Sequence, residues 1–497
     1  MNKERFEIEN EILDKLSGKI FLLQDAEPKH EIMFQAFLEV YNSPKYQDAI
    51  RKYQELDPEA FFNKFISYGI IEEFLQDPEV EDIMINYLSP IYVHKTHSGL
   101  VKTDKRFSSQ EELDLFIKKL VVFSGRKRLN KINNIELANA KGRVNIVLSP
   151  FGPQITITRA KEKPLSIIEL IKSGVLNPQL AAQFWLYVEG LGVKPANIFV
   201  SGAAGTGKTT LMNALFSFIP ATERVVLIED TLELNTDIYA EESYSRLTSD
   251  EDATLADLVK NTLRMRPDRI VVGEVRGREA QDLMTAVNIG KYCMGTLHAP
   301  TARETIMRLE NEPMNVPCVL ISLVDVFVIM RMYNINNKMV RVVGELVETG
   351  GMEQKTVLLS TLWLYDLPNS RFRESTVSSI YRDKLSKISG KSPKEINEEL
   401  IVRTKLIEVM LERDIKDIRE VTNFCRKYIE APYATIVGLG LRREDLLDER
   451  QFAHAAQNIA VPVAHATGIV AIVEMRVELN DRDRFVPVIA AQDREAD

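Results

Sequence analysis

The sequence predicts an α/β protein in its central part, with an α+β region before it and a helical region after it. Within residues 165–350, short apolar runs alternate with segments of helical spacing, which is typical of a parallel sheet covered by helices. One apolar run, residues 197–200, leads into a glycine-rich loop and then into residues 211–216, whose apolar positions have helical spacing. This strand–loop–helix order sets the fold class.

Length and composition limit the possible classes of protein. The chain has 497 residues, which is enough for two or three domains, and its 45% apolar and 27% charged residues are ordinary for a globular protein. The net charge of −9 argues against a broad nucleic-acid-binding surface, so we expect no direct nucleic-acid partner. Cys293, Cys318 and Cys425 lie far apart, which fits a reducing compartment and neither a disulfide framework nor a zinc module.

Neither a signal peptide nor a membrane-spanning helix is expected. The first residues are polar and charged, without the apolar core of a signal peptide. The best apolar candidate, residues 316–330, contains Asp325 and is shorter than the roughly 20 residues that a span needs. We therefore expect a cytoplasmic protein that reaches the inner face of the membrane only through a partner.

The region before the central domain divides into two parts. Residues 1–65 have helical spacing, and residues 66–160 mix helices with strands. The expected elements of the second part are helices at 70–75 and 111–122, strands at 83–86 and 91–94, and a strand pair at 143–148 and 155–158. A proline-containing linker at residues 161–164 follows, and we interpret it as a hinge.

The region after the central domain changes character once. Residues 351–430 are expected to be mostly helical, with one helix starting at Ser392 and another near residues 417–420. Lys427 is the last lysine, and residues 431–497 form a lysine-free tail in which residues 469–479 alternate like a strand. The tail is either a small appended subdomain or sequence of separate origin, and its role is open.

The glycine-rich loop carries the most specific signal. Residues 202–209 match the pattern G-x-x-x-x-G-K-[ST] of a phosphate-binding loop. Its glycines let the backbone turn tightly and aim N–H groups at phosphate oxygens, and the following helix offers the positive end of its dipole. Lys208 can reach the β- and γ-phosphates, and the Thr209 hydroxyl can coordinate Mg²⁺. We therefore expect the chain to bind ATP and Mg²⁺.

Three further strands end in polar residues. The apolar run 225–228 is followed by the carboxylates Glu229, Asp230 and Glu233, which could hold Mg²⁺ through its waters. The run 269–272 leads to Glu274, which could orient or deprotonate an attacking water. A third short strand ends at His298. Each of these residues alone could be merely structural, but their order within one domain favours a shared site. Two arginines, Arg264 and Arg266, precede the second strand.

The four motifs together resemble the secretion-superfamily ATPases, which power type II secretion, type IV pili, archaella and conjugation. GAAGTGKT, IEDTLEL, RIVVGEVRG and GTLHAPTARETIMRL are similar to the family's Walker A, Asp box, Walker B and His box. Residues 75–85 resemble the start of the family's amino-terminal domain, so the resemblance covers roughly residues 65–428. The stretch LRMRPDR and the missing zinc module look closest to the archaeal and tight-adherence-type branch.

The resemblance implies roles for individual residues. Glu274 would be the catalytic glutamate, Glu229 would lie near the metal and the water, and His298 would sense the γ-phosphate. Arg143 and Arg159 would reach the nucleotide from the amino-terminal domain. Arg159 stands one residue beyond the family's usual Thr-Ile-Arg, which turns its side chain to the other face of the strand. The implied phosphate- and metal-binding residues are Gly202, Gly205, Thr206, Gly207, Lys208, Thr209 and Thr210.

The resemblance further implies a homo-hexamer of RecA-like ATPase domains, each hinged to its amino-terminal domain. Such a motor would act on an integral-membrane platform protein to assemble a type IV pilus-like or archaellum-like filament, or to drive type II-like secretion. Pilus retraction, a conjugation-type ATPase, a nucleic-acid translocase and a non-hydrolysing scaffold are the alternatives.

Overall fold

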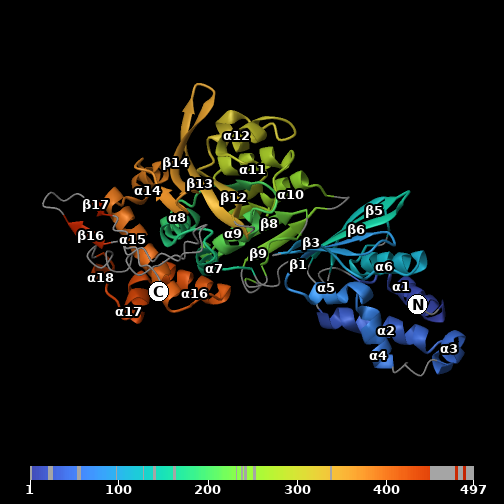
Figure 1. The fold of residues 1–497 in the computed structure, drawn as a ribbon. Helices are drawn as coiled ribbons and strands as arrows, with labels where there is room; N and C mark the ends of the chain where they lie inside the picture. The colour runs from blue at the N-terminus through green and yellow to red at the C-terminus, as the bar shows by residue number, and fades with distance from the viewer. Residues whose placement is uncertain are drawn as a thin grey trace.

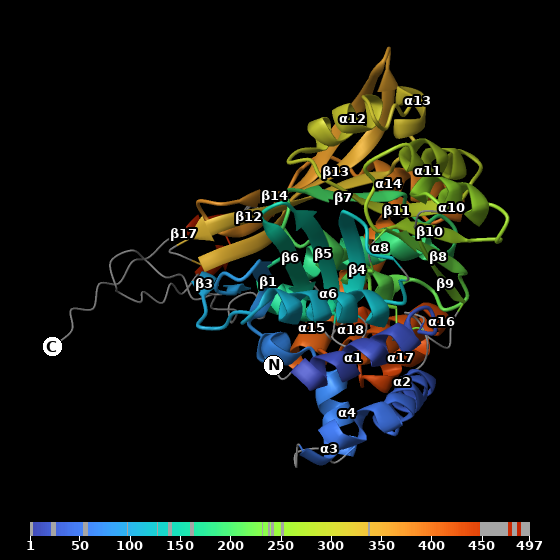
Figure 2. The same ribbon diagram turned by 90° about the vertical axis from the view of Figure 1, so that its right-hand side faces the viewer.

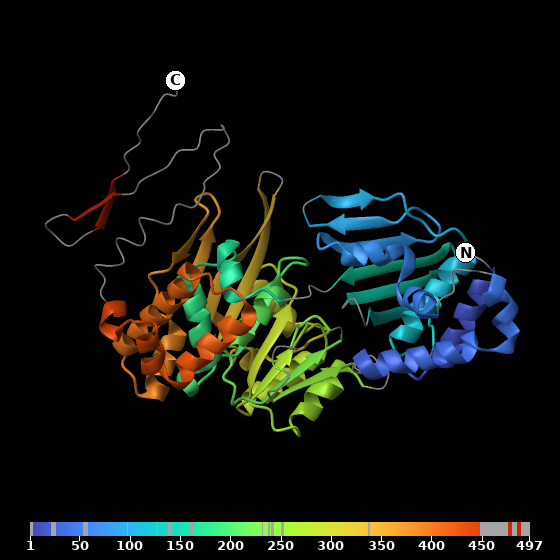
Figure 3. The ribbon, with the colours of Figure 1, turned by 90° about the horizontal axis from the view of Figure 1, so that it is seen from below.

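The computed structural model describes most of residues 3–447 and two short strands beyond them (Figure 1). Within 3–447 the residues that it leaves out are 21–25, 53–57, 97, 127, 138–141, 160–163, 231, 237–238, 240–242, 250–252 and 336–337. The expected hinge at 161–164 therefore lies outside the described residues, except for Pro164. The amino-terminal domain lies to one side of the central domain (Figure 3).

The amino-terminal domain is a six-stranded antiparallel sheet in the order β3-β2-β1-β6-β5-β4, packed against helices. Its strands are β1 (Val80–Asn86), β2 (Tyr92–Lys95), β3 (Gly99–Lys102), β4 (Ile132–Leu137), β5 (Gly142–Ser149) and β6 (Gly152–Arg159). Its helices are α1 (Lys3–Leu16), α2 (Ala26–Tyr41), α3 (Gln47–Lys52), α4 (Pro58–Ile66), α5 (Glu72–Gln76) and α6 (Gln110–Phe123). One continuous core joins the sheet to α1, α2, α4 and α6. The structure thus has the expected elements, and β3 and β4 are additional.

The central domain is built on a nine-stranded sheet in the order β15-β14-β13-β12-β7-β11-β10-β8-β9. The strands from β12 to β9 in this order run parallel, and β13, β14 and β15 continue the sheet antiparallel. The bounds are β7 (Ile198–Gly202), β8 (Val225–Glu229), β9 (Tyr244–Thr248), β10 (Arg269–Val272), β11 (Tyr292–Leu297), β12 (Val326–Ile335), β13 (Lys338–Glu353), β14 (Thr356–Asp366) and β15 (Arg371–Glu374).

Helices cover both faces of this sheet (Figure 2). Along β7, Ile198 and Val200 face one core and Phe199 faces the other, as the alternation of a strand requires. The first core is completed by α7 (Ile167–Lys172), α8 (Pro178–Glu189), α9 (Lys208–Leu215), α14 (Ile380–Ser389), α15 (Pro393–Glu412) and α16 (Ile418–Glu430). The second core is completed by α10 (Leu255–Thr262), α11 (Glu279–Asn288), α12 (Ala302–Glu310) and α13 (Cys318–Ile321).

The region expected to be helical from residue 351 begins instead with strands. Strands β14 and β15 extend the nine-stranded sheet to Glu374, and helices start only at Ile380. The stretch from Thr356 to Asp366 is rich in leucine, threonine and aromatic residues and pairs with β13 as a hairpin, so tertiary pairing overrides the helical tendency of its leucines. The helix expected at Ser392 is present as α15, where Ser392 and Glu395 form a capping box.

The compositional border near residue 430 is not a structural border. Helices α17 (Pro432–Gly438) and α18 (Arg443–Leu447) continue the domain, and Ile436 and Leu446 are 2% and 4% exposed within its main core. Beyond them, β16 (Arg476–Leu479) pairs with β17 (Phe485–Val488) as a separate two-stranded sheet. The strand expected at 469–479 coincides with β16 in part, because residues 469–475 lie outside the described residues.

Among the described residues, no helix is long and apolar enough to span a membrane. The apolar stretch at 316–330 is divided between α13 and the start of β12, both of which belong to the central domain.

Candidate nucleotide site

The phosphate loop joins the carboxyl end of β7 to α9 and has the backbone shape that its glycines predict. Gly205 and Gly207 adopt φ angles of 73° and 93°, which favour glycine over residues with a side chain. At Gly202 a Cβ atom would lie 2.5 Å from the carbonyl oxygen of Met330 on β12, so no side chain fits there. The loop is therefore fixed between its own helix and the neighbouring strand.

Lys208 is folded back onto the loop. Its side chain is 7% exposed and donates hydrogen bonds to the carbonyl oxygens of Gly202 and Ala203 at 3.1 and 2.9 Å. Its Nζ also lies 3.4 Å from Nδ1 of His298, at the end of β11. Burial lowers the pKa of Lys208, and burial together with the charge of Lys208 lowers the pKa of His298. The histidine is therefore held close to a cation in the phosphate site.

Glu274 completes a line of three polar groups. The strands β7, β11 and β10 are parallel neighbours, so their carboxyl ends meet at one edge of the sheet. As a result, Oε1 of Glu274 lies 3.3 Å from Nε2 of His298. Burial, with the nearby charge of Glu233, raises the pKa of Glu274. The structure thus brings Lys208, His298 and Glu274 together, as the sequence predicts.

Glu229 lies at the end of β8 but does not face the phosphate loop. It is 1% exposed, and its Oε1 accepts hydrogen bonds from the amides of Glu233 and Leu234 at 2.9 Å. Its Oε2 accepts from Arg246 at 3.1 and 3.2 Å, and burial raises its pKa. Both oxygens are therefore occupied in shaping the loop that follows β8.

Glu233, in that same loop, is the carboxylate that faces the phosphate loop. Its Oε2 accepts a hydrogen bond from the Thr209 hydroxyl at 3.0 Å. The sequence shows a cluster of carboxylates after the apolar run, and the family resemblance points to Glu229 among them. Glu229 is the last residue of a strand that is buried throughout, whereas Glu233 lies in the following loop with an exposed side chain.

The two arginines of the amino-terminal domain have different positions. Arg143 on β5 reaches Oε1 of Glu233 at 3.4 Å and so meets the site. In the β5–β6 register Arg143 lies opposite Thr158, which places Arg159 on the other face. There Arg159 donates to the carbonyl oxygens of Val80, at 3.0 Å, and Asp77. The structure does not bring Arg159 to the nucleotide loop, and the one-residue offset is the reason.

The remaining residues named from the sequence lie around this centre. Thr206 is buried and donates to the carbonyl oxygen of Ala203 at 2.8 Å, and Thr210 is half-buried in the first turn of α9. Arg264 and Arg266 are exposed on the loop before β10.

Two residues with contacts at the site were not predicted from the sequence. Arg341 on β13 donates from Nε to the carbonyl oxygen of Gly205 at 2.8 Å. Glu136 on β4 accepts a hydrogen bond from the amide of Leu232 at 2.7 Å. No local motif marks either residue, because each contact joins distant parts of the chain.

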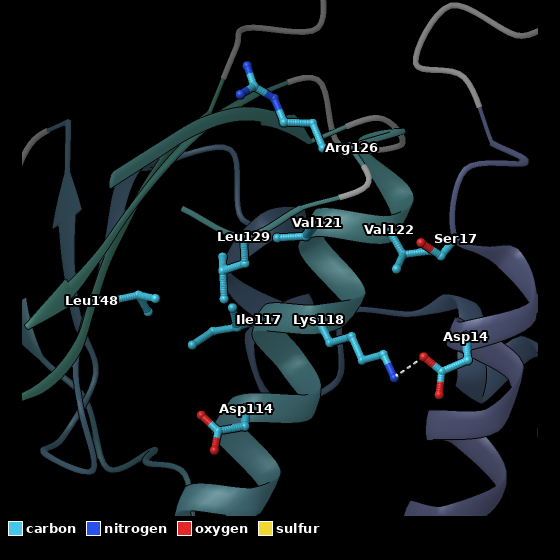
Figure 4. Close-up of a pocket in the computed structure, with 10 residues that line it drawn as sticks. All are labelled: Asp14, Ser17, Asp114, Ile117, Lys118, Val121, Val122, Arg126, Leu129 and Leu148. Atoms are coloured by element: carbon cyan, nitrogen blue, oxygen red, sulfur yellow. Dashed lines mark ion pairs between the residues drawn. The ribbon is translucent and has the colours of Figure 1, made fainter. Parts of the chain in front are cut away.

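A cavity of about 460 Å³ lies elsewhere, in the amino-terminal domain between α1, α6 and the sheet (Figure 4). Lys118 of α6 and Asp14 of α1, which form an ion pair of 2.7 Å, are among its lining residues, and so are the apolar side chains of Ile117, Val121 and Leu148. Its lining residues are distinct from those of the phosphate loop.

The phosphate loop, with neighbouring parallel strands that lead to Glu274 and His298, defines a RecA-like P-loop nucleotide-binding domain. The particular family follows from comparison with known sequences. The chain belongs to the type II/IV secretion system protein family, whose model matches residues 67–348. The resemblance found in the four motifs is thereby confirmed.

The chain is also similar to individual proteins. The uncharacterized protein MJ0900 of Methanocaldococcus jannaschii is 30% identical over 381 residues, which is 73% of this chain and 68% of its own length. The probable conjugal transfer protein TrbB of Sinorhizobium fredii is 30% identical over 242 residues, 48% of this chain and 72% of its own. Among solved structures, the pilus retraction motor PilT with bound ADP aligns over 65% of this chain and 88% of its own, at 18% identity and a TM-score of 0.42.

Proposed function

We propose that this chain is a Mg²⁺-dependent ATP hydrolase that works as the motor of a membrane-associated assembly. The observation that carries the proposal is the line Lys208–His298–Glu274 across three adjacent strand ends, with spacings of 3.4 and 3.3 Å. In this arrangement a cation for the phosphates and a carboxylate for the attacking water share one histidine. That combination suits hydrolysis better than binding alone.

The residues at the phosphate loop fit Mg²⁺. The Thr209 hydroxyl and the Glu233 carboxylate are 3.0 Å apart and are the hard oxygen ligands that Mg²⁺ prefers. When bound, the ion would neutralise charge on the phosphate oxygens. Lys208 would then move from the loop carbonyls to the phosphates, while the loop amides orient them. Glu229 would support Glu233 by holding the loop backbone.

Glu274 is the proposed base. Its raised pKa keeps it a better proton acceptor than an ordinary glutamate while it is ionised. His298 lies between Glu274 and Lys208, so it would contact the terminal phosphate and adjust the position of Glu274 when that phosphate is present. Arg143, which contacts Glu233 beside the phosphate loop, would then turn toward the phosphates and stabilise the negative charge that develops on them.

We further propose that the motor is a homo-hexamer at the inner face of the cell membrane, acting on an integral-membrane platform protein. Assembly of a pilus-like or archaellum-like filament, or type II-like secretion, is the favoured task, and membership of the type II/IV secretion family supports it. The conjugal-transfer relatives keep a conjugation-type role as the second candidate. The acidic net charge of −9 counts against a nucleic-acid translocase.

The test is turnover and assembly of the purified full chain. ATP hydrolysis should require Mg²⁺ and stop on chelation, and light scattering with a non-hydrolysable ATP analogue should show six subunits. Single-stranded DNA should leave the rate unchanged, because a translocase would be stimulated by it. Full activity as a strict monomer would refute the ring, and no Mg²⁺-dependent turnover in any assembly state would favour a scaffold.

A further inference from the structure

A cross-strand pair on the amino-terminal sheet meets the loop after β8 at two successive residues. Glu136 on β4 and Arg143 on β5 are directly opposite each other in the β4–β5 register. Glu136 Oε1 accepts the hydrogen bond of the Leu232 amide at 2.7 Å, and Arg143 lies 3.4 Å from the carboxylate of the next residue, Glu233. The two domains therefore touch through a defined pair of side chains.

The two contacts differ in character. Arg143 and Glu233 are 45% and 49% exposed, and an ion pair as exposed as this contributes little to holding two domains together. Glu136 is half-buried and bonds to backbone, so its partner cannot rotate away as a side chain can. Burial raises the pKa of Glu136 to about 6, which agrees with a carboxylate that has lost water on docking. Glu136 is thus the firmer of the two contacts.

The loop that Glu136 holds is directly linked to the phosphate loop. Glu229 fixes the amides of Glu233 and Leu234 from the ATPase side, and Glu233 accepts the hydrogen bond of Thr209. The loop is therefore bonded to the ATPase domain on one side and to the amino-terminal sheet on the other. Movement of the sheet would reach Thr209 through these bonds.

We propose that Glu136 is a positioning residue that couples the amino-terminal domain to the phosphate site by holding the Leu232 amide. By this bond Glu136 fixes the distance between its cross-strand neighbour Arg143 and Glu233. During turnover the same bond would fix the distance between Arg143 and the phosphates. The kinetic part of this inference rests on the proposed ATPase function. The bond itself does not, so the two are tested separately.

The first test needs no turnover. Amide hydrogen exchange at single-residue resolution is measured on the nucleotide-free full chain. Glu136→Ala should speed exchange at Leu232 about fivefold or more, while the Glu233 and Leu234 amides, which bond to Glu229, change much less. Glu136→Gln should stay near wild type, since its amide oxygen still accepts the bond. Unchanged exchange at Leu232, or equal acceleration at all three amides, would overturn the proposal.

The matched control is Asn134→Ala. Asn134 is exposed on the same face of β4, two residues away, and pairs with Asn145 within the amino-terminal sheet. It should leave both exchange and turnover unchanged, which separates the Leu232 contact from general loosening of β4. An effect equal to that of Glu136→Ala would refute a specific role for Glu136.

The second test uses the kinetics. Glu136→Ala should lower kcat about three- to tenfold with little change in KM, because Arg143 is displaced while the phosphate loop is intact. Added to Arg143→Ala, it should lower kcat no further, since both act through one contact. Additive losses would overturn the coupling. If the wild type itself shows no hydrolysis, the proposed function fails, and the exchange experiment still decides whether Glu136 holds the loop.

Discussion

The surroundings of Glu274 determine its pKa and, through the pKa, the pH dependence expected for turnover. Burial and the charge of Glu233 raise its pKa, and a base must be ionised to accept a proton. We therefore expect kcat to fall as the pH drops through this raised pKa, at a higher pH than an ordinary glutamate would give. Glu274→Gln should bind ATP normally but lose about 10²- to 10³-fold in kcat, and the remaining activity should lack this acid limb. Wild-type turnover by this variant would refute the assignment.

Glu229 and Glu233 are four residues apart and should respond oppositely to mutation. Glu229→Ala removes the buried partner of Arg246 and the acceptor of two amides, so urea unfolding should show a loss of about 3 kcal/mol. Glu233→Ala removes only exposed contacts, so stability should change by less than about 1 kcal/mol. Its effect should instead be a higher Mg²⁺ concentration for half-maximal turnover. If Glu229→Ala raised the Mg²⁺ requirement without loss of stability, Glu229 would be the metal ligand.

At the scale of elements, the strands that carry motifs were predictable, whereas β4, which carries one of the contacts between the domains, was not. Strands β7, β8 and β10 are apolar runs that end at polar residues, so their sequence shows both the strand and the site. Strand β4 contains two asparagines and no apolar run, and it forms because β5 supplies its pairing partner. The role of Glu136 depends on Leu232, 96 residues away, and no spacing in the sequence encodes that contact.

The β12–β13 hairpin is a second element with a role that the sequence does not show. Arg341 braces the phosphate loop through the carbonyl oxygen of Gly205, and its Cδ would lie 3.7 Å from a Cβ at Gly207. Loss of one such hydrogen bond costs about 1 kcal/mol, so Arg341→Ala should raise the Kd for ATP about three- to tenfold. Arg331→Ala is the matched control, because Arg331 pairs with Glu345 within the hairpin. Titration calorimetry on both variants decides whether the effect belongs to the loop contact.

At the scale of the whole molecule, the carboxyl-terminal border of the folded domain differs from what composition suggests. The lysine-free stretch after Lys427 predicts that a chain ending near Glu430 keeps its activity and assembly. In the structure, α17 and α18 bury Ile436 and Leu446 in the main core, and Arg443 pairs with Glu399 at 3.2 Å. The absence of lysine describes only the composition of this segment. Whether its side chains are buried depends on the surface against which they pack.

Two truncated chains test whether the folded domain ends near Glu430, where the composition changes, or at Leu447, where α18 ends. A chain ending at Glu430 should lose the burial of Ile436 and Leu446, worth about 1.5–3 kcal/mol for each side chain, and expose the apolar surface they cover. It should unfold at a lower urea concentration and tend to aggregate. A chain ending at Leu447 keeps these contacts and should match the full-length protein in stability and ATP turnover. Equal stability of the shorter chain would show that α17 and α18 contribute nothing to the core, and composition alone would then have marked the end of the motor.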